Sequence, residues 1–195
     1  MNALSRRLLL LGSAALSAAI AVVVIYTAGL PLRLDYASYL TYSGDLLAAP
    51  EIGAHAPQFD LPRLDGPRLR LADLSGSPVV LNFWATWCAP CRVEMPALQQ
   101  LHEDYHEAGL RVLGINTGET ARAVQRWRDA LKLEFDLLLD TSQVTAALYR
   151  LRGYPTTYVV SPAGVITHVF HGPVSADSLR AALAPFLTSS SEDAS

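Results

Sequence analysis

The chain has 195 residues, which suffices for one ordinary domain with some extra length but not for two large domains. Its net charge of -3 shows no basic excess and argues against a protein that binds nucleic acid by neutralising phosphates. Hydrophobic residues make up 51% of the chain, and charged residues only 17%. Since globular proteins average about 25% charged residues, one stretch must be nearly free of charge. The two cysteines, Cys88 and Cys91, are too few for a disulfide framework or a four-cysteine zinc site.

The uncharged stretch lies near the N-terminus, where Arg6 and Arg7 are followed by residues 8–30 without a charged side chain. As a helix this run would measure roughly 34 Å, which is enough to cross a bilayer core. The two arginines place residues 1–7 in the cytoplasm and everything after residue 30 outside it. We therefore expect a transmembrane signal anchor. A cleaved signal peptide is the alternative, because residues 13–21 include many small side chains.

Three further segments follow the apolar run. Residues 31–50 contain prolines, tyrosines and a glycine, which is typical of a juxtamembrane spacer. Residues 51–188 are long enough for a sizeable core and are expected to form the folded domain. Residues 189–195 form a polar tail that we expect to be disordered.

The domain alternates strand and helix patterns in chain order. Two short extended pieces, 59–61 and 68–71, flank an Asp-Gly-Pro turn and predict an N-terminal hairpin. Hydrophobic periodicity then predicts strands at 79–84, 110–116, 135–139, 156–161 and 165–170, and helices at 88–108, 120–131, 142–149 and 175–184. This order indicates an α/β fold with a partly parallel sheet covered by helices and an antiparallel hairpin at its edge.

The cysteine pair lies where the strand 79–84 gives way to a helix. The first backbone N–H groups of a helix are unpaired and carry partial positive charge, so a thiolate at Cys88 would be stabilised and its pKa lowered. Pro90 fits the first turn, where a missing N–H costs nothing. Cys91 follows one turn later and can close a disulfide. One thiolate would attack a substrate and the other would resolve the mixed disulfide.

A zinc site is the competing interpretation of the cysteines, since His102 and His106 follow at finger-like spacing. Cys91 and His102 would lie about 16 Å apart along one helix, whereas a zinc–ligand bond is about 2 Å long. The two histidines are therefore assigned to a solvated helix face, and we expect no metal or other cofactor.

Two motifs together resemble the thioredoxin superfamily: Trp-Cys-x-Pro-Cys at 87–91 after an apolar strand, and Gly-Tyr-Pro-Thr-Thr at 153–157 before a later one. With the N-terminal anchor, the extra hairpin and Glu94, the chain is most similar to membrane-anchored, extracytoplasmic thiol–disulfide oxidoreductases of the TlpA/ResA type. This resemblance implies a thioredoxin-like fold, with a mixed central sheet flanked by helices, over residues 51–188.

The resemblance also implies roles for individual residues. Cys88 matches the nucleophilic cysteine, Cys91 the resolving cysteine, and Pro155 the cis-proline that faces them. Trp87 matches the tryptophan beside the nucleophile, and Pro96 matches the proline that kinks the active-site helix. We expect the substrate to contact three residues around the cysteines, namely Trp87, Tyr154 and Thr156.

One position departs from thioredoxin, which has a buried aspartate in the strand before the motif. Here Asn82 occupies that place and cannot take a proton. Glu94 is the candidate replacement, because it follows Cys91 by three residues and shares its helix face. In ResA-type proteins an acid at this place tunes the cysteine pair, and a carboxylate near thiols raises their pKa. A plain solvent-exposed glutamate is the alternative.

The expected activity is reduction of disulfides in client proteins by a membrane-tethered domain outside the cytoplasm. The resemblance implies apocytochrome c as the leading client and a transmembrane electron donor of the CcdA/DsbD type. Disulfide donation by the same residues is an alternative that the Ala-Pro dipeptide at 89–90 does not exclude. A copper-delivery module would need another soft ligand, and Met95 is better explained as core. A peroxidase of this superfamily would need a threonine where the chain has Ala85.

Overall fold

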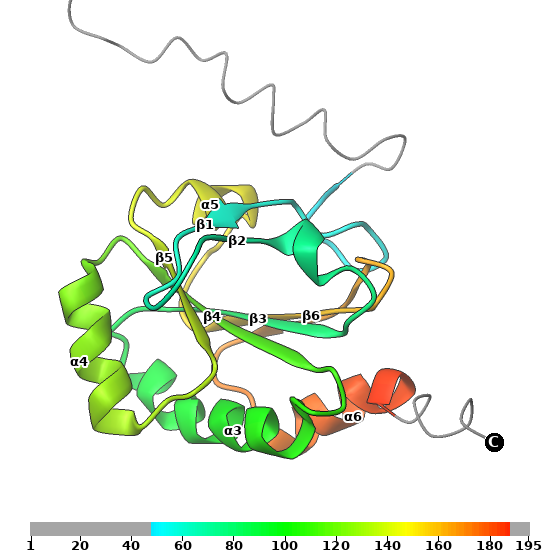
Figure 1. The fold of residues 1–195 in the computed structure, drawn as a ribbon. Helices are drawn as coiled ribbons and strands as arrows, with labels where there is room; N and C mark the ends of the chain where they lie inside the picture. Colours follow the sequence, from blue (N-terminus) through cyan, green and yellow to red (C-terminus); the bar gives the residue numbers. More distant parts are fainter. Residues whose placement is uncertain (1–47, 188–195) are drawn as a thin grey trace, which may run out of the picture. The chain divides into compact units, whose positions relative to one another are not determined.

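The computed structural model describes residues 48–187, which fold around a five-stranded sheet (Figure 1). The strand order is β5-β4-β3-β6-β7. The strands are β3 (Val79–Trp84), β4 (Arg111–Thr117), β5 (Asp136–Asp140), β6 (Thr156–Val160) and β7 (Ile166–His171). The β3–β4 and β4–β5 pairs are parallel, whereas the β3–β6 and β6–β7 pairs are antiparallel. The expected mixed central sheet, with an antiparallel hairpin at one edge, is confirmed.

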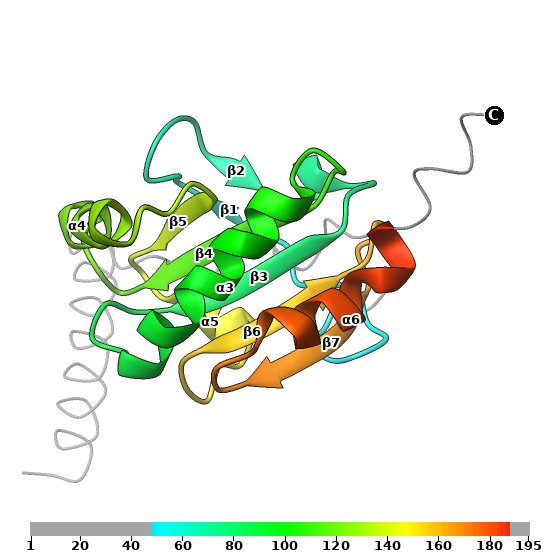
Figure 2. The ribbon, with the colours of Figure 1, turned by 90° about the horizontal axis from the view of Figure 1, so that it is seen from below.

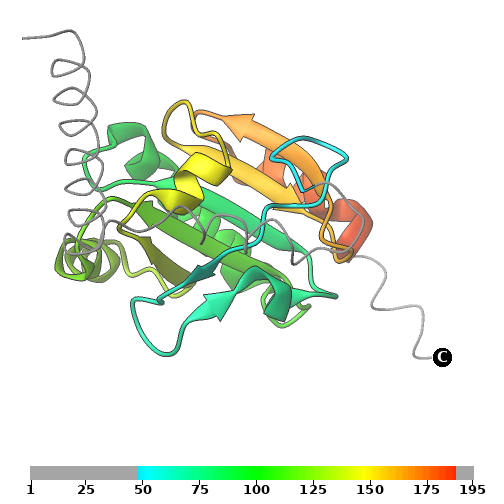
Figure 3. The same cartoon turned by 90° about the horizontal axis from the view of Figure 1, so that it is seen from above.

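Helices and short elements cover both faces of the sheet. They are α3 (Ala89–Tyr105), α4 (Ala121–Leu131), α5 (Val144–Leu148) and α6 (Ala176–Leu187), the short strands β1 (Asp60–Leu61) and β2 (Leu69–Arg70), and the 3-10 helix η1 (Leu71–Leu74). Seen from below, α3 and α6 lie side by side over the sheet (Figure 2). Seen from above, the β1–β2 pair, η1 and α5 lie over the other face (Figure 3).

The alternation of side chains along β3 divides the core into two layers. Val80 and Trp84 belong to the cluster that packs under α3 and α6, and Leu81 and Phe83 belong to the cluster on the opposite face. Successive side chains of a strand point to opposite faces, and every residue of this central strand is buried. Asn82 therefore lies in the row that faces α3, as a polar residue between two large apolar ones.

The predicted order of strands and helices is confirmed, and the N-terminal hairpin is confirmed as the antiparallel β1–β2 pair. The structure adds η1, which the sequence analysis did not predict. The helix predicted at 142–149 is shorter, because Gln143 has a left-handed backbone (φ 60) and caps α5. The helix predicted at 88–108 ends at Tyr105, and Gly109 (φ 93) turns the chain into β4.

Several segment predictions fall outside the described residues: 1–7, the transmembrane segment 8–30, the tail 189–195 and all but the last residues of the spacer 31–50. Between residues 48 and 187, no helix combines the length and hydropathy needed to cross a membrane. At the start of this range, the Ala49 N–H donates to the His55 carbonyl, so the last residues of the spacer contact the domain.

Replacing Gly114 of β4 tests how tightly the layer under α3 and α4 is packed. A Cβ at this position would lie 2.8 Å from Leu137 Cδ2 and 2.9 Å from Phe135 Cε2, both on buried side chains. We expect Gly114→Ala to lower the free energy of unfolding by about 1–3 kcal/mol, measured by urea denaturation. Gly153→Ala is the control, since a Cβ added at Gly153 would have no atom within 4 Å beyond its chain neighbours. Equal effects of the two changes would contradict this account of the packing.

Candidate active site

The cysteine pair lies at the junction between β3 and α3, as predicted, and is closed as a disulfide with an S–S distance of 2.07 Å. Cys88 is the N-cap residue of α3, and its Sγ accepts a hydrogen bond from the Cys91 N–H at 3.1 Å. The Cys88 N–H donates to the Ala85 carbonyl, so residues 85–88 form a tight turn into the helix. Pro90 lies in the first turn, where its missing N–H leaves no hydrogen bond unmade.

This geometry distinguishes the two sulfurs. In the reduced protein a thiolate at Cys88 would face the unpaired N–H groups and the positive end of the helix dipole, which stabilise it. Cys88 retains 4% of its surface, whereas Cys91 is fully buried. The difference favours the predicted roles, in which Cys88 attacks a client disulfide and Cys91 resolves the mixed disulfide, and both roles stay predictions.

The Tyr154–Pro155 peptide bond is cis, as the resemblance implied. Pro155 is buried and directly precedes β6, whose residue Thr156 pairs with Phe83 of β3. Because β6 runs antiparallel to β3, the start of β6 lies beside the C-terminal end of β3, where the cysteine turn begins. The fold thus brings the two predicted motifs together from positions far apart in the sequence.

The three residues predicted to contact substrate have different surroundings. Trp87 is 69% exposed and packs edge-on against the half-buried Tyr154, with ring centroids 5.5 Å apart. Thr156 is only 1% exposed, and its hydroxyl donates to the Gly153 carbonyl of its own loop. A substrate contact stays a prediction for all three, and at Thr156 the side chain is already bonded within the protein.

Glu94 is buried inside the domain, so the alternative of a solvent-exposed glutamate is wrong. It lies one turn after Cys91 on the buried face of α3. Its Oε1 accepts from Asn82 Nδ2 at 2.6 Å, and its Oε2 accepts from the Val174 N–H at 3.1 Å. Burial raises the pKa of the Glu94 carboxyl from 4.5 to about 7, and the two hydrogen bonds oppose that rise. The site therefore holds an acid that titrates near neutral pH beside the cysteine helix.

Sequence reasoning missed the end of β4 and the loop after it, which brace both motifs. The Glu119 carboxylate accepts from the Thr86 N–H (2.7 Å), the Thr86 hydroxyl and Asn116 Nδ2 (2.7 Å). The Thr117 hydroxyl donates to the Tyr154 hydroxyl at 2.7 Å. The end of β4 and the loop after it thus hold the turn before Cys88 and the loop before Pro155. No local sequence signal marks the contacts to Thr86 and Tyr154, because those partners lie 33 and 37 positions away.

The structure gives no support to a metal centre in residues 48–187, where no three His, Cys, Asp or Glu side chains form a cluster able to hold an ion. Met95 is fully buried in the core, as expected. His102 stacks on His106 and is partly buried against Phe135, so only part of the predicted solvated face is exposed.

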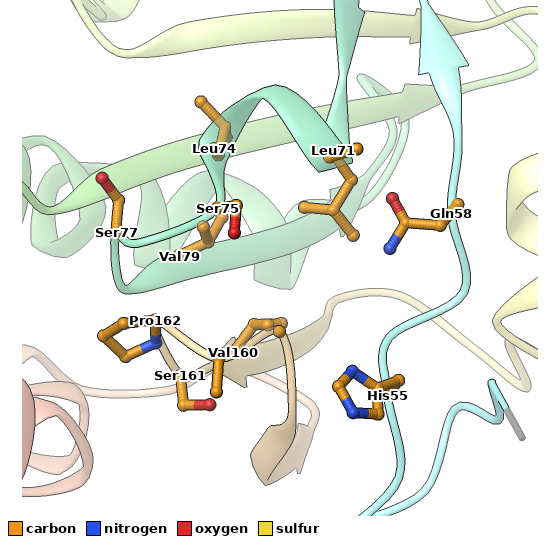
Figure 4. A pocket seen from close by; sticks show the side chains of 13 residues that line it. His55, Gln58, Leu71, Leu74, Ser75, Ser77, Val79, Val160, Ser161 and Pro162 are labelled. Atoms are coloured by element: carbon orange, nitrogen blue, oxygen red, sulfur yellow. The ribbon is translucent and has the colours of Figure 1, made fainter. Parts of the chain in front are cut away.

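A cavity of about 260 Å³ lies between η1 and the turn that joins β6 to β7 (Figure 4). Its lining includes Val79 at the start of β3 and Val160 at the end of β6. The cysteine turn follows the other end of β3, about 17 Å away at the rise of a strand. This cavity is therefore separate from the cysteine site.

Residues 52–169, more than half of the chain, match the AhpC/TSA family. The chain belongs to this family. Thioredoxin-like protein YneN of Bacillus subtilis is 39% identical over 137 residues, which cover 69% of this chain and 79% of YneN. Thiol-disulfide oxidoreductase ResA of Geobacillus kaustophilus is 31% identical over 159 residues, which cover 80% of this chain and 91% of that protein.

Solved structures agree with this family assignment. A thiol:disulfide interchange protein from Chlorobium tepidum matches with a TM-score of 0.63 and 26% identity, over 70% of this chain and 98% of that one. A secreted Mycobacterium tuberculosis disulfide oxidoreductase matches with a TM-score of 0.60 and 28% identity, over 66% of this chain and 96% of that one. This AhpC/TSA protein has the thioredoxin-like fold and is a protein-disulfide oxidoreductase of the TlpA/ResA type.

The buried acid makes the stability of the oxidised protein depend on pH. Between pH 4.5 and about 7 the unfolded chain loses the Glu94 proton while the folded chain keeps it. The free energy of unfolding should therefore fall as pH rises through this window, by about 3 kcal/mol, and stay level above it. Glu94→Gln should remove this fall, so that the variant gains stability relative to the natural protein between pH 4.5 and pH 8. Urea denaturation at several pH values measures the difference.

Glu103→Gln is the matched control, because Glu103 lies on the exposed face of the same helix, where it accepts a hydrogen bond from Gln99. It removes one carboxylate from α3 without touching the buried site. Parallel curves for Glu94→Gln and the natural protein would show that Glu94 does not keep its proton on folding.

Proposed function

We propose that this oxidoreductase works as a reductant of client proteins outside the cytoplasm. The Cys88 thiolate attacks one sulfur of a client disulfide, and the other client sulfur leaves as a thiolate that takes up a proton. Cys91 loses its proton and attacks Cys88 Sγ, which releases the second client thiol and leaves the Cys88–Cys91 disulfide seen in the structure. The client gains two electrons, and an external donor must return two electrons to the pair.

The observation that carries the direction is the burial of Glu94 one turn after Cys91. Strong disulfide donors owe their oxidising power to a stabilised reduced form. A buried carboxylate beside the pair disfavours a thiolate and so destabilises that form. The helix N-terminus acts in the opposite sense, by up to about 2 kcal/mol at a partly buried site. In this proposal the carboxylate outweighs the helix end, so that the pair gives electrons away.

The proposed place and partners of the reaction are supported by the N-terminal sequence and by the resemblance to the family. Residues 8–30 would anchor the chain in the membrane and hold residues 51–188 on the outer face. A transmembrane carrier of the CcdA/DsbD type would supply the electrons. The family resemblance favours apocytochrome c as the leading client, through the disulfide of its haem-binding cysteines. Other exported proteins with disulfides are the next candidates.

The reduction potential of the Cys88–Cys91 pair tests the direction. We expect a value below about -200 mV, obtained by equilibration with glutathione or dithiothreitol buffers and alkylation of free thiols. A potential well above that value, toward the range of strong oxidants, would establish the opposite reaction, in which the same residues donate disulfides.

Trapping tests the client. Cys91→Ser should leave the mixed disulfide between Cys88 and its client unresolved, so that non-reducing electrophoresis and mass spectrometry identify the client. The chain has no other cysteine, and the Cys88→Ser/Cys91→Ser double variant is therefore a control that can form no adduct. Recovery of apocytochrome c or other exported disulfide proteins with the single variant alone is expected. Recovery of the same proteins with the double variant would exclude disulfide exchange as the cause.

A further inference from the structure

Glu94 is held by a buried polar cluster that joins three elements beneath the cysteine turn. Asn82 of β3 donates through Nδ2 to Glu94 Oε1 of α3 at 2.6 Å and to Thr157 Oγ1 of β6 at 2.9 Å. The three side chains are at most 2% exposed. The Val174 N–H, just before α6, closes the other side of the carboxyl group at 3.1 Å.

The hydrogen bonds of this cluster match an ionised Glu94. Both carboxyl oxygens accept, one from Asn82 and one from Val174. The other half of the Asn82 amide, Oδ1, is buried and has no hydrogen-bond partner among the described residues. A buried amide oxygen without a donor is costly, and native structures contain few of them.

A proton on Glu94 changes which orientation of the amide fits best. Since the Val174 N–H can only donate, Oε2 stays an acceptor and the proton belongs on Oε1, which faces Asn82. If the amide turns over, Asn82 Oδ1 accepts from Oε1–H, and it accepts from the Thr157 hydroxyl at the same time. No heavy atom has to leave its place, because the oxygen and nitrogen of an amide are nearly equal in size.

The two orientations are closely balanced within the protein itself. In the orientation seen in the structure, Asn82 Oδ1 lacks a hydrogen-bond partner and the Thr157 hydroxyl accepts from Nδ2. In the turned orientation, Nδ2 would lack a partner and the Thr157 hydroxyl would donate to Oδ1. Whether Glu94 carries a proton then decides which orientation of the amide is the more stable.

We propose that Asn82 is a positioning residue for Glu94, and that its side-chain amide turns over each time Glu94 gains or loses a proton. Asn82 thereby offers a hydrogen bond to both forms of the acid, so that Glu94 exchanges a proton with solvent water while its carboxyl group stays in place. This role concerns the thiol–disulfide site in either redox direction and does not depend on the direction proposed above.

Among the titratable and charged groups near Asn82, Glu94 is the one that can determine the orientation of the amide in the oxidised protein. Strands β3 and β6 carry no charged side chain, and Tyr158 points to the opposite core layer. On α6, Arg180 pairs with Asp177 and with Asp104 at the exposed surface. His171, at the end of β7, is exposed. Cys91 is the other titratable group on the same face of α3, and it does not titrate in the oxidised protein.

Nuclear magnetic resonance of the full-length, oxidised, 15N-labelled chain tests the proposal. The side-chain NH2 signals of Asn82 should shift between pH 5 and pH 9, with the same midpoint as the Val174 amide signal, which reports Glu94 independently. In Glu94→Gln both shifts should disappear, and the Asn82 signals should stay at their low-pH positions, because the introduced glutamine can donate to Asn82 Oδ1 and accept from Val174. Asn116 is the matched control: its amide donates to a different carboxylate, Glu119, so its signals should not follow the Val174 midpoint.

A titrating Val174 signal with constant Asn82 signals would overturn the proposal, since Glu94 would then change its proton without turning the amide. Constant signals from both residues would also overturn it, since no proton would be gained or lost. Neither failure would bear on the redox direction, which the reduction potential decides separately.

A second measurement uses the reduced chain and the pH dependence of Cys88 alkylation. Asn82→Leu removes the hydrogen bond to each form of Glu94 at nearly constant volume. The bond to the carboxylate is charge-assisted and the stronger of the two, so the Glu94-dependent inflection should move up by about one pH unit. Thr157→Val removes a hydroxyl that serves both orientations and should leave the inflection within about half a unit. Equal shifts in the two variants would reduce Asn82 to a packing role and contradict the proposal.

Discussion

The site depends on one constraint, the requirement that the first turn of α3 find acceptors for its N–H groups. A helix leaves these groups unpaired, and here Cys88 Sγ accepts one of them at the cap position. The nucleophile must therefore precede the helix, and Cys91 must follow one turn inside it. Strand β3, buried between β4 and β6, fixes where that turn begins. The order of strand, turn and helix thus determines the reactivity of the sulfur.

The same helix brings an opposing influence to the cysteines. Its N-terminus favours a thiolate at Cys88, whereas Glu94 on its buried face disfavours one when ionised. Burial raises the pKa of Glu94 from 4.5 to about 7, so its carboxyl group gains or loses its charge near neutral pH. Because the carboxyl titrates near neutral pH, the balance at the sulfur changes within the ordinary range of pH.

The sequence predicted the parts of this site that are encoded locally. The alternation of strands and helices, the cap position of Cys88 and the placement of Glu94 one turn after Cys91 follow from spacing along the chain. The long-range partners could not be predicted in this way, since Val174 lies 80 positions from Glu94 and Glu119 lies 33 positions from Thr86. The burial of Thr156 was missed for a related reason, because two adjacent threonines at the start of a strand give no signal of their surroundings.

The topology of the sheet explains why these distant segments meet. Strands β3 and β4 are parallel and β6 is antiparallel to β3. The C-terminal ends of β3 and β4 therefore lie beside the start of β6, at the same end of the strands. Hydrogen bonds from Glu119, just after β4, and from Thr117, at its end, brace the other two loops through Thr86 and Tyr154. The exposed ring of Trp87 rests on Tyr154, and through it on β4. A client therefore meets a surface whose shape is held by the sheet, while proton exchange at Glu94 takes place beneath it.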